Sequence, residues 1–272
     1  MRYEFTTTPA PTVALVLGRG RIEITGVAGI RTVTVDVDGE GVVAEQRRQA
    51  IAVRQERHRQ GAEDATVHLT VPAGTTLVGR TAVATITQHG TLGTVRLQHG
   101  TGTLSLGRIA ETLVAKTGAG DITVEEVGGS AVLQSGAGRI ELGRAGGSSR
   151  IATGVGDIEV GRLDAVADLK TGAGGILVRR ASADLTLRSG SGPMEVLLFD
   201  GEHLTARNHS GAISVGIPEG RPVWRDVVTV TGQLVSTLPP TGEPAKGTRH
   251  AEIRAVTRHG DVTLRPAEEP AA

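Results

Sequence analysis

The stretch that decides the fold is residues 116–161, "KTGAGDITVEEVGGSAVLQSGAGRIELGRAGGSSRIATGVGDIEVG". Three times in it a Thr or Ser is followed by Gly, a small residue and Gly, and soon after by an aliphatic, a polar and an aliphatic residue. We call the first residue of each copy the marker, and markers recur every 18 residues. The markers are Thr117, Ser135, Thr153, Thr171 and Ser189. Further copies begin 18 residues earlier at His99, at Asn208 after one extra residue, and at Thr257 after an interruption.

Each copy contains the patterns of two short strands. The positions five and seven residues after the marker are apolar and the position between them is mostly polar, which is typical of a strand with one buried face. An apolar position two residues before the marker indicates the second strand. One copy cannot bury its apolar residues alone, but stacked copies can. The sequence therefore predicts an all-β fold, a parallel β-solenoid built from 18-residue turns.

A sandwich of short antiparallel strands is the alternative architecture, and the regular register of strands and corners argues against it. A nucleotide-binding loop is the alternative for the glycines. Such a loop needs a following helix whose N-terminus holds the phosphates, whereas "GAGD" is followed by the strand pattern "ITVEEV". Because the glycines recur in every copy, we expect them to form tight corners that need positive φ or close backbone approach.

The pattern divides the chain into four segments. Residues 1–80 carry a degraded version of it and are predicted to be irregular capping strands with a polar loop at 54–64, because terminal repeats must cover exposed edges. Residues 81–216 are the regular repeats. Residues 217–265 are an excursion with a strand near 227–230, a flexible proline-rich loop at 238–248 and a final repeat. Residues 266–272 are predicted to be a disordered tail.

The composition excludes several classes of function. The 272 residues include 29 basic and 29 acidic residues and no cysteine, so disulfides, thiolate metal sites and thiol nucleophiles are ruled out. No secretory signal pattern and no apolar run of membrane-spanning length occur in the sequence. We therefore expect a cytoplasmic protein without a transmembrane segment. With four aromatic residues, the chain lacks the stacking platforms typical of single-stranded nucleic-acid binding, and no nucleic-acid partner is expected.

Several of these motifs together resemble a known family. The turns "TGAGDITV", "TGVGDIEV" and "TRHGDVTL", the entries "VPAG" and "IPEG", and "VWRDVVTVTGQLVSTLPP" are similar to the bacterial putative-adhesin family of β-strand repeat proteins. The resemblance covers roughly residues 12–265. It implies a β-solenoid of unknown function, with no established enzymatic activity and no catalytic motif to carry over.

No catalytic, cofactor-binding or metal site is expected. Asp121, Asp157 and Asp261 follow corner glycines, but calcium needs six to eight oxygens at one point, so we interpret these residues as ordinary turn residues. The histidines show no metal-ligand spacing beside a third ligand. Glu141, Glu159 and Glu195 share an outward column, yet a glycoside-cleaving pair needs carboxylates in different environments. We therefore predict that the protein is not an enzyme.

One outward column is rich in Lys and Arg and can indicate a binding function. It carries four cations one residue before their markers, and the last three lie on successive turns. Like charges side by side in a sheet are unfavourable, so such a stripe can indicate an anionic partner; the alternative is that the side chains simply splay into solvent and protect edges. The predicted basic stripe is Lys116, Lys170, Arg188 and Arg207.

These patterns support three hypotheses of function. The leading one is a non-enzymatic binding or scaffold module whose partner is an unknown protein or an anionic surface. The second is a structural protein that assembles into filaments, or into smaller homo-oligomers, through the ends of the solenoid. The third, an exported adhesin or a carbohydrate-acting β-helix enzyme, needs an export route and a site for which the sequence gives no sign.

Overall fold

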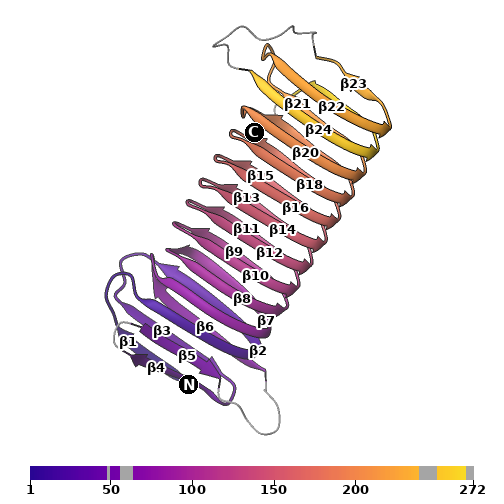
Figure 1. Ribbon diagram of the computed structural model, residues 1–272. Helices are drawn as coiled ribbons and strands as arrows, with labels where there is room; N and C mark the ends of the chain where they lie inside the picture. The colour runs from indigo at the N-terminus through magenta and orange to yellow at the C-terminus, as the bar shows by residue number, and fades with distance from the viewer. Residues whose placement is uncertain (48–49, 56–63, 239–249, 268–272) are drawn as a thin grey trace. The chain divides into compact units, whose positions relative to one another are not determined.

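The structure is a computed structural model that describes residues 1–47, 50–55, 64–238 and 250–267 (Figure 1). Twenty-five strands and no helix are found in these residues, so the described part of the chain holds no helix that could cross a membrane. The chain forms two compact units, Met1–Ala137 and Gly138–Ala272. Both are built from stacked strands, and the predicted fold class, an all-β parallel solenoid, is confirmed.

Unit 1 contains two long strands that each make a whole turn, and shorter strands on either side of them. The first part of β2 (Thr12–Val27) pairs in parallel with β5, its second part pairs with β6, and its whole length pairs with β7 (Thr76–Leu92). β7 is followed by two parallel sheets, β8–β10–β12 and β9–β11. The remaining strands are β1 (Arg2–Thr6), β3 (Thr32–Asp38), β4 (Val42–Arg47), β5 (Ala50–Gln55), β6 (Ala65–Pro72), β8 (Val95–Thr101), β9 (Leu104–Ile109), β10 (Leu113–Ala119), β11 (Ile122–Val127) and β12 (Ala131–Ala137).

The N-terminal end of unit 1 is irregular, as the sequence predicts. β4 adds to β5 in antiparallel orientation, and β3 adds to β6 and β1 to β3 in the same way. The edge strands β1 and β4 carry charged residues such as Arg2, Glu4 and Arg47, which discourage further strand pairing. β5 extends to Gln55, so it includes the first residues of the predicted loop at 54–64; residues 56–63 of that loop lie outside the described residues.

Unit 2 consists of two facing sheets whose strands stack turn upon turn (Figure 1). One sheet contains β14, β16, β18, β20, β24 and β22, and the other contains β13, β15, β17, β19, β21, β25 and β23. Within both sheets the neighbours are parallel. The strands are β13 (Ile140–Ala145), β14 (Ser149–Val155), β15 (Ile158–Leu163), β16 (Ala167–Ala173), β17 (Ile176–Ala181), β18 (Leu185–Ser191), β19 (Met194–Phe199), β20 (His203–Ser210), β21 (Ile213–Ile217), β22 (Val223–Thr231), β23 (Leu234–Ser236), β24 (Ala251–His259) and β25 (Val262–Pro266).

The order of turns at the C-terminal end of unit 2 differs from the order along the chain. β24 pairs with β20 on one side and with β22 on the other, so the later strand lies between two earlier ones. The excursion after residue 217 therefore forms the outermost turn, β22 and β23. Arg221 anchors its start, because its buried side chain donates to Asp200 Oδ1 (2.5 Å) and to the Gly201 carbonyl (2.6 Å).

The end of the chain is ordered further than expected. β25 continues to Pro266, and the Ala267 amide donates to the Ile217 carbonyl at 2.8 Å. The first two residues of the predicted tail are thus part of the last turn. Residues 268–272 of that tail, and 239–248 of the predicted proline-rich loop, lie outside the described residues.

The core of unit 2 lies between the two sheets and is made of the apolar columns. The positions two residues before and five and seven residues after each marker are buried through the regular turns, which confirms the predicted alternation. Apolar burial on this scale is the main force that stabilises the stack. The column five residues after the marker contains Ile158, Ile176, Met194, Ile213 and Val262.

The corner after each marker brings successive turns into close contact. The third residue after the marker is a glycine with positive φ, and in Gly174 φ is +142°. A Cβ on Gly174 would lie 2.2 Å from the carbonyl oxygen of Gly156 in the preceding turn, so no larger residue fits. Thr171, the marker of the same turn, is buried and donates its hydroxyl to that Gly156 carbonyl at 2.9 Å. The marker therefore stabilises the corner of the preceding turn through a buried hydrogen bond. The glycines form the tight corners, as predicted.

Replacing one corner glycine should destabilise the protein strongly. We expect Gly174→Ala to lower the free energy of unfolding by at least ~2 kcal/mol, because it combines an unfavourable φ with a clash against backbone. The measurement is the urea midpoint of the full chain. Gly175→Ala is the matched control, since its Cβ would be no closer than 3.4 Å to a neighbour; equal losses in the two variants would contradict the corner model.

Candidate binding surface

Three of the four predicted stripe residues lie side by side in unit 2. Lys170 of β16 is the Cα partner of Arg188 of β18, which is the partner of Arg207 of β20. All three side chains are exposed. Among the described residues, Arg188 has one acidic neighbour, Asp168, at 3.8 Å, and Lys170 and Arg207 form no ion pair. We call these three residues the unit 2 stripe.

Lys116, the fourth predicted residue, belongs to β10 of unit 1. Its Cα partner is Gln98, whose other partner is Arg80. Arg80 is exposed and lines a hollow of about 470 Å³ together with Lys116 and Gln98. The glycine motif does not mark Arg80, because the sequence after Thr81 is Ala-Val-Ala and lacks the glycines. The 18-residue period does mark it, since Thr81 lies 18 residues before the marker His99.

The surface beside the unit 2 stripe is flat and free of acids on one side. Two residues further along the same strands, on the same outward face, stand Gly172, Gly190 and His209. The two glycines have no side chain to cover the strand. On the other side of the stripe, Asp168 is followed by Thr186 and Thr205. The positive charge of the stripe is therefore open toward the glycine side.

A second group of arginines in unit 2 is neutralised by acids. Glu159 accepts hydrogen bonds from Arg179 (2.6 Å) and Arg139 (2.5 Å), and the bond from Arg179 is the main reason that the pKa of Glu159 is lowered. Arg162 and Arg144 hold Asp164 in the same way, at 2.6 and 2.9 Å, and lower its pKa. These carboxylates stay ionised at neutral pH.

The glutamate column does not have the arrangement of a glycosidase. A general acid needs a raised pKa, whereas Glu159 has a lowered one. Glu141 pairs with Arg139 at 2.7 Å, and Glu195 with Arg265 at 3.1 Å. The three glutamates thus share one environment, a carboxylate held by an arginine.

Two of the corner aspartates accept hydrogen bonds from backbone amides. Asp157 Oδ1 accepts the Gly175 amide of the next turn at 2.7 Å, and Asp261 Oδ1 accepts the Gln233 amide at 2.8 Å. This geometry supports their interpretation as turn residues. In the described part of the chain, no cluster of three or more His, Asp or Glu residues is placed to hold a metal ion.

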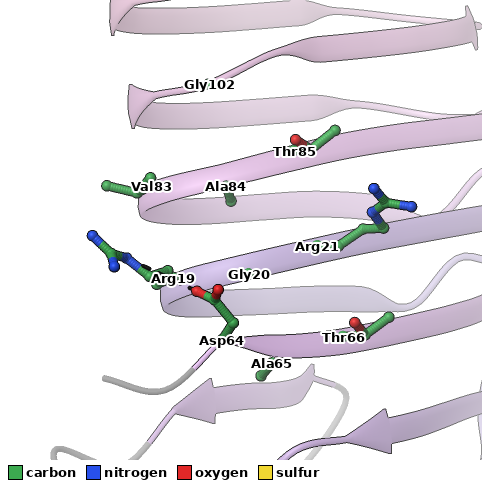
Figure 2. Close-up of a pocket in the computed structure, with 10 residues that line it drawn as sticks. All are labelled: Arg19, Gly20, Arg21, Asp64, Ala65, Thr66, Val83, Ala84, Thr85 and Gly102. Carbon is green, nitrogen blue, oxygen red and sulfur yellow. Dashed lines mark ion pairs between the residues drawn. The ribbon is translucent and has the colours of Figure 1, made fainter. Parts of the chain in front are cut away.

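A second hollow lies in unit 1, where β6 and β7 flank β2 (Figure 2). It measures about 560 Å³. Arg19 and Asp64 face each other at one end of it with a 3.9 Å ion pair, and Arg21 stands beside Thr66 and Thr85. The one carboxylate in the lining is already paired, so the hollow offers no pair of catalytic groups.

His99 occupies a marker position and is nearly buried, with 5% of its surface exposed. Its Nδ1 lies 2.6 Å from the hydroxyl of Thr81, the equivalent position of the preceding turn. Burial lowers the pKa of His99 from its ordinary value. Most other markers are Thr or Ser, so His99 replaces a small hydroxyl in the buried column with a group that can take up a proton.

Comparison with known proteins gives structural neighbours only. No family model matches the chain, and no curated protein matches it. Among solved structures, it is similar to a putative adhesin from Bacteroides fragilis, with 12% identity, coverage of 98% of this chain and 96% of that chain, and a TM-score of 0.39. It is also similar to two proteins from Parabacteroides distasonis, a putative adhesin (13% identity, TM-score 0.35) and a putative lipid binding protein (12%, 0.34), each covering 98% of this chain and 96% of that chain.

Two of these three neighbours bear the description of the family that the turn motifs resemble. Identities of 12–13% transfer no site residue and no function to this chain.

The buried histidine should make stability depend on pH. Because the folded-state pKa lies below the ordinary value of 6.5, the unfolded chain binds the proton more readily. The contribution of His99 is therefore fully present above about pH 6.5 and is lost as the pH falls toward the folded-state pKa. We expect His99→Asn, which copies Asn208 in the same column, to flatten the fall in the urea midpoint between about pH 7 and 5. The exposed His89→Asn is the control, and an unchanged slope in His99→Asn would contradict this assignment.

Proposed function

We propose that the protein is a non-enzymatic binding module that holds an anionic partner against the unit 2 stripe. The observation that carries this proposal is the alignment of Lys170, Arg188 and Arg207 on adjacent parallel strands, with Asp168 as the one acid paired to them in the described residues. Three cations in register repel one another. An anion placed across them relieves that repulsion.

The chemistry of the stripe suits carboxylate or phosphate groups. Arginine offers a planar fork of donors that matches both, and neighbouring turns place the side chains about 4.8 Å apart. The arginines elsewhere in unit 2 show what happens when acids are supplied internally, because Asp164 and Glu159 each bind two of them. In the unit 2 stripe the one such partner among the described residues is Asp168, 3.8 Å from Arg188, and this incomplete compensation supports an external partner.

The arrangement of acids supports the non-enzymatic part of the proposal. Glu141, Glu159 and Glu195 are paired with arginines. Asp157 and Asp261 accept hydrogen bonds from backbone amides. A cytoplasmic location and the lack of a nucleic-acid partner remain predictions from the sequence.

Reversing the charge of the stripe should abolish binding to a polyanion. At balanced net charge, retention on immobilised polyglutamate at low salt has to come from a local patch, and it should weaken with salt because exposed charges are screened. We expect Arg188→Glu/Arg207→Glu to lose retention while its circular dichroism and urea midpoint stay unchanged. Arg144→Glu/Arg162→Glu makes the same change in net charge where Asp164 already neutralises the arginines. Equal retention of wild type and the stripe variant would overturn the proposal.

Assembly through the C-terminal end is a second candidate function. β22 and β23 each pair with one strand in the described residues, and a strand at the end of a sheet can add a further strand along its outer edge. However, Arg225 of β22 is the Cα partner of Ile253, whose other partner is Leu204. A charge thus stands in the core column of the outermost turn, a known device against edge-to-edge stacking.

Light scattering over a concentration series tests this second candidate. We expect a constant mass for the wild-type protein, because continued stacking would bury Arg225. Arg225→Ile, which restores the core column, should increase the mass with concentration. Growth of the wild-type mass, with rods of constant width in negative stain, would instead establish the filament function.

A further inference from the structure

We infer that the anionic partner of the unit 2 stripe is a lipid surface with anionic headgroups, docked by the outward face of β16, β18, β20, β24 and β22. This inference rests on the proposed function and names the chemical class of its partner. The observation behind it is that the column of cations runs into exposed valines at the edge of the same sheet.

The register shows this continuity. Arg207 of β20 is the Cα partner of Val256 of β24, and Val256 is the partner of Val228 of β22. The outward column therefore reads Lys170, Arg188, Arg207, Val256, Val228. Partners in parallel strands point to the same face, so three cations and two apolar residues lie on one surface of unit 2. The five strands that carry them are labelled in Figure 1.

The neighbouring column also has an arginine next to an exposed valine at its β22 end. Two residues further along the five strands stand Gly172, Gly190, His209, Arg258 and Val230. Neither column contains an acid. Together the two columns form a flat strip that is cationic toward β16 and apolar at the edge strand β22. We call it the docking strip.

Three acids lie on this face of the five strands, all outside the docking strip. Glu252 of β24 is the Cα partner of Trp224 and lies 3.7 Å from His203. The other two lie in the column on the other side of the strip. Asp168 of β16 and Asp226 of β22 both stand there, two residues before Lys170 and Val228. Each is already paired with an arginine, because Asp226 lies 3.0 Å from Arg254 and Asp168 lies 3.8 Å from Arg188. Asp168 thus offsets one cation of the docking strip, whereas Lys170, Arg207 and Arg258 form no ion pair in the part of the chain that the structure describes. The docking strip keeps a net positive charge.

The apolar end of the docking strip is unusually exposed. Val228 and Val230 expose 51% and 71% of their surface, and Trp224, on the same face of β22, exposes 55%. Edge strands of soluble proteins normally carry charges, and the charges of β22 are Arg225, on its inward side, and Asp226, outside the docking strip. Exposed apolar residues that lie together mark an interaction site.

A lipid surface satisfies both ends of the strip at once. Its phosphates attract Lys and Arg, and its interfacial region accepts apolar and aromatic side chains. An acidic peptide could pair with the unit 2 stripe, but it would have to supply apolar residues in register to cover Val228 and Val230. A fluid interface requires no such register, and the flat strip formed by Gly172 and Gly190 matches a flat partner.

The expected size of the effect follows from the two kinds of contact. Each Lys or Arg near an anionic leaflet strengthens binding by about fivefold. Loss of two arginines should thus weaken vesicle binding by at least about 25-fold, before the repulsion of the added carboxylates. Replacing both valines should weaken vesicle binding by about tenfold, because their apolar surface would no longer be buried in the interface.

Vesicle sedimentation with the full chain tests the inference. The probes are vesicles of pure phosphatidylcholine and of phosphatidylcholine with about one third phosphatidylserine. The variants are Arg188→Glu/Arg207→Glu and Val228→Ser/Val230→Ser, and Val166→Ser is a matched control because Val166 is equally exposed, at 58%, outside the strip. Trp224 is the single tryptophan of the sequence, so its emission reports directly on β22, with Trp224→Phe as the blank.

We expect binding to the phosphatidylserine vesicles alone, a blue shift of the Trp224 emission, loss of binding in the arginine variant and weaker binding in the valine variant. The valine variant should still be retained on polyglutamate, and Val166→Ser should behave as wild type. Retention on polyglutamate without vesicle binding, or vesicle binding that the valine variant leaves unchanged, would overturn the lipid inference but keep the proposed function. If the protein bound neither polyglutamate nor the phosphatidylserine vesicles, the proposed function and the lipid inference would both be overturned.

Discussion

The fold depends on the close approach of glycine to glycine between successive turns. In unit 2 the carbonyl of each corner glycine lies where a side chain of the next corner would be, through Gly156, Gly174, Gly192, Gly211, Gly260 and Gly232. The same carbonyls receive the buried hydroxyl or amide of the next marker, as Thr171 and Asn208 show. A carbonyl buried without a donor would cost about 1–3 kcal/mol. The close approach of the turns therefore requires the glycine of the Thr/Ser-Gly-x-Gly motif, and the buried carbonyl requires the hydrogen-bond donor of its first residue.

This constraint leaves the outward positions free. Because the core columns and corners hold the turns in register, the outward side chains bear little of the folding energy and can be chosen for charge. Unit 2 uses that freedom in two ways. Asp164 and Glu159 bind arginines in closed ion pairs, which contribute little to stability at an exposed surface. Lys170, Arg188 and Arg207 are instead left without such a network, and a surface with incomplete internal compensation is suited to an external anion.

The outermost turn of unit 2 has a charge on its inward side and apolar residues on its outward side. Arg225 stands where the core column would continue, while Val228 and Val230 occupy the outward positions. The inward charge opposes stacking of another turn, whereas the outward valines extend the cationic face into an apolar one. The two features act on different surfaces of β22, so resistance to end-on assembly and the capacity to dock on a surface can coexist in one strand.

The sequence by itself determined the repeat, the strand alternation and the corner glycines, because each is a local pattern with an 18-residue period. It also placed Lys170, Arg188 and Arg207 on adjacent turns, since each stands one residue before the marker of its turn. It did not reveal Arg80, whose turn lacks the glycines, or the continuation of β25 to Pro266. Only the tertiary structure decided that β24 inserts between β20 and β22. The physical reason is that the order of turns is set by which strand edge each segment pairs with, and a long excursion can reach either edge at little extra cost in loop entropy.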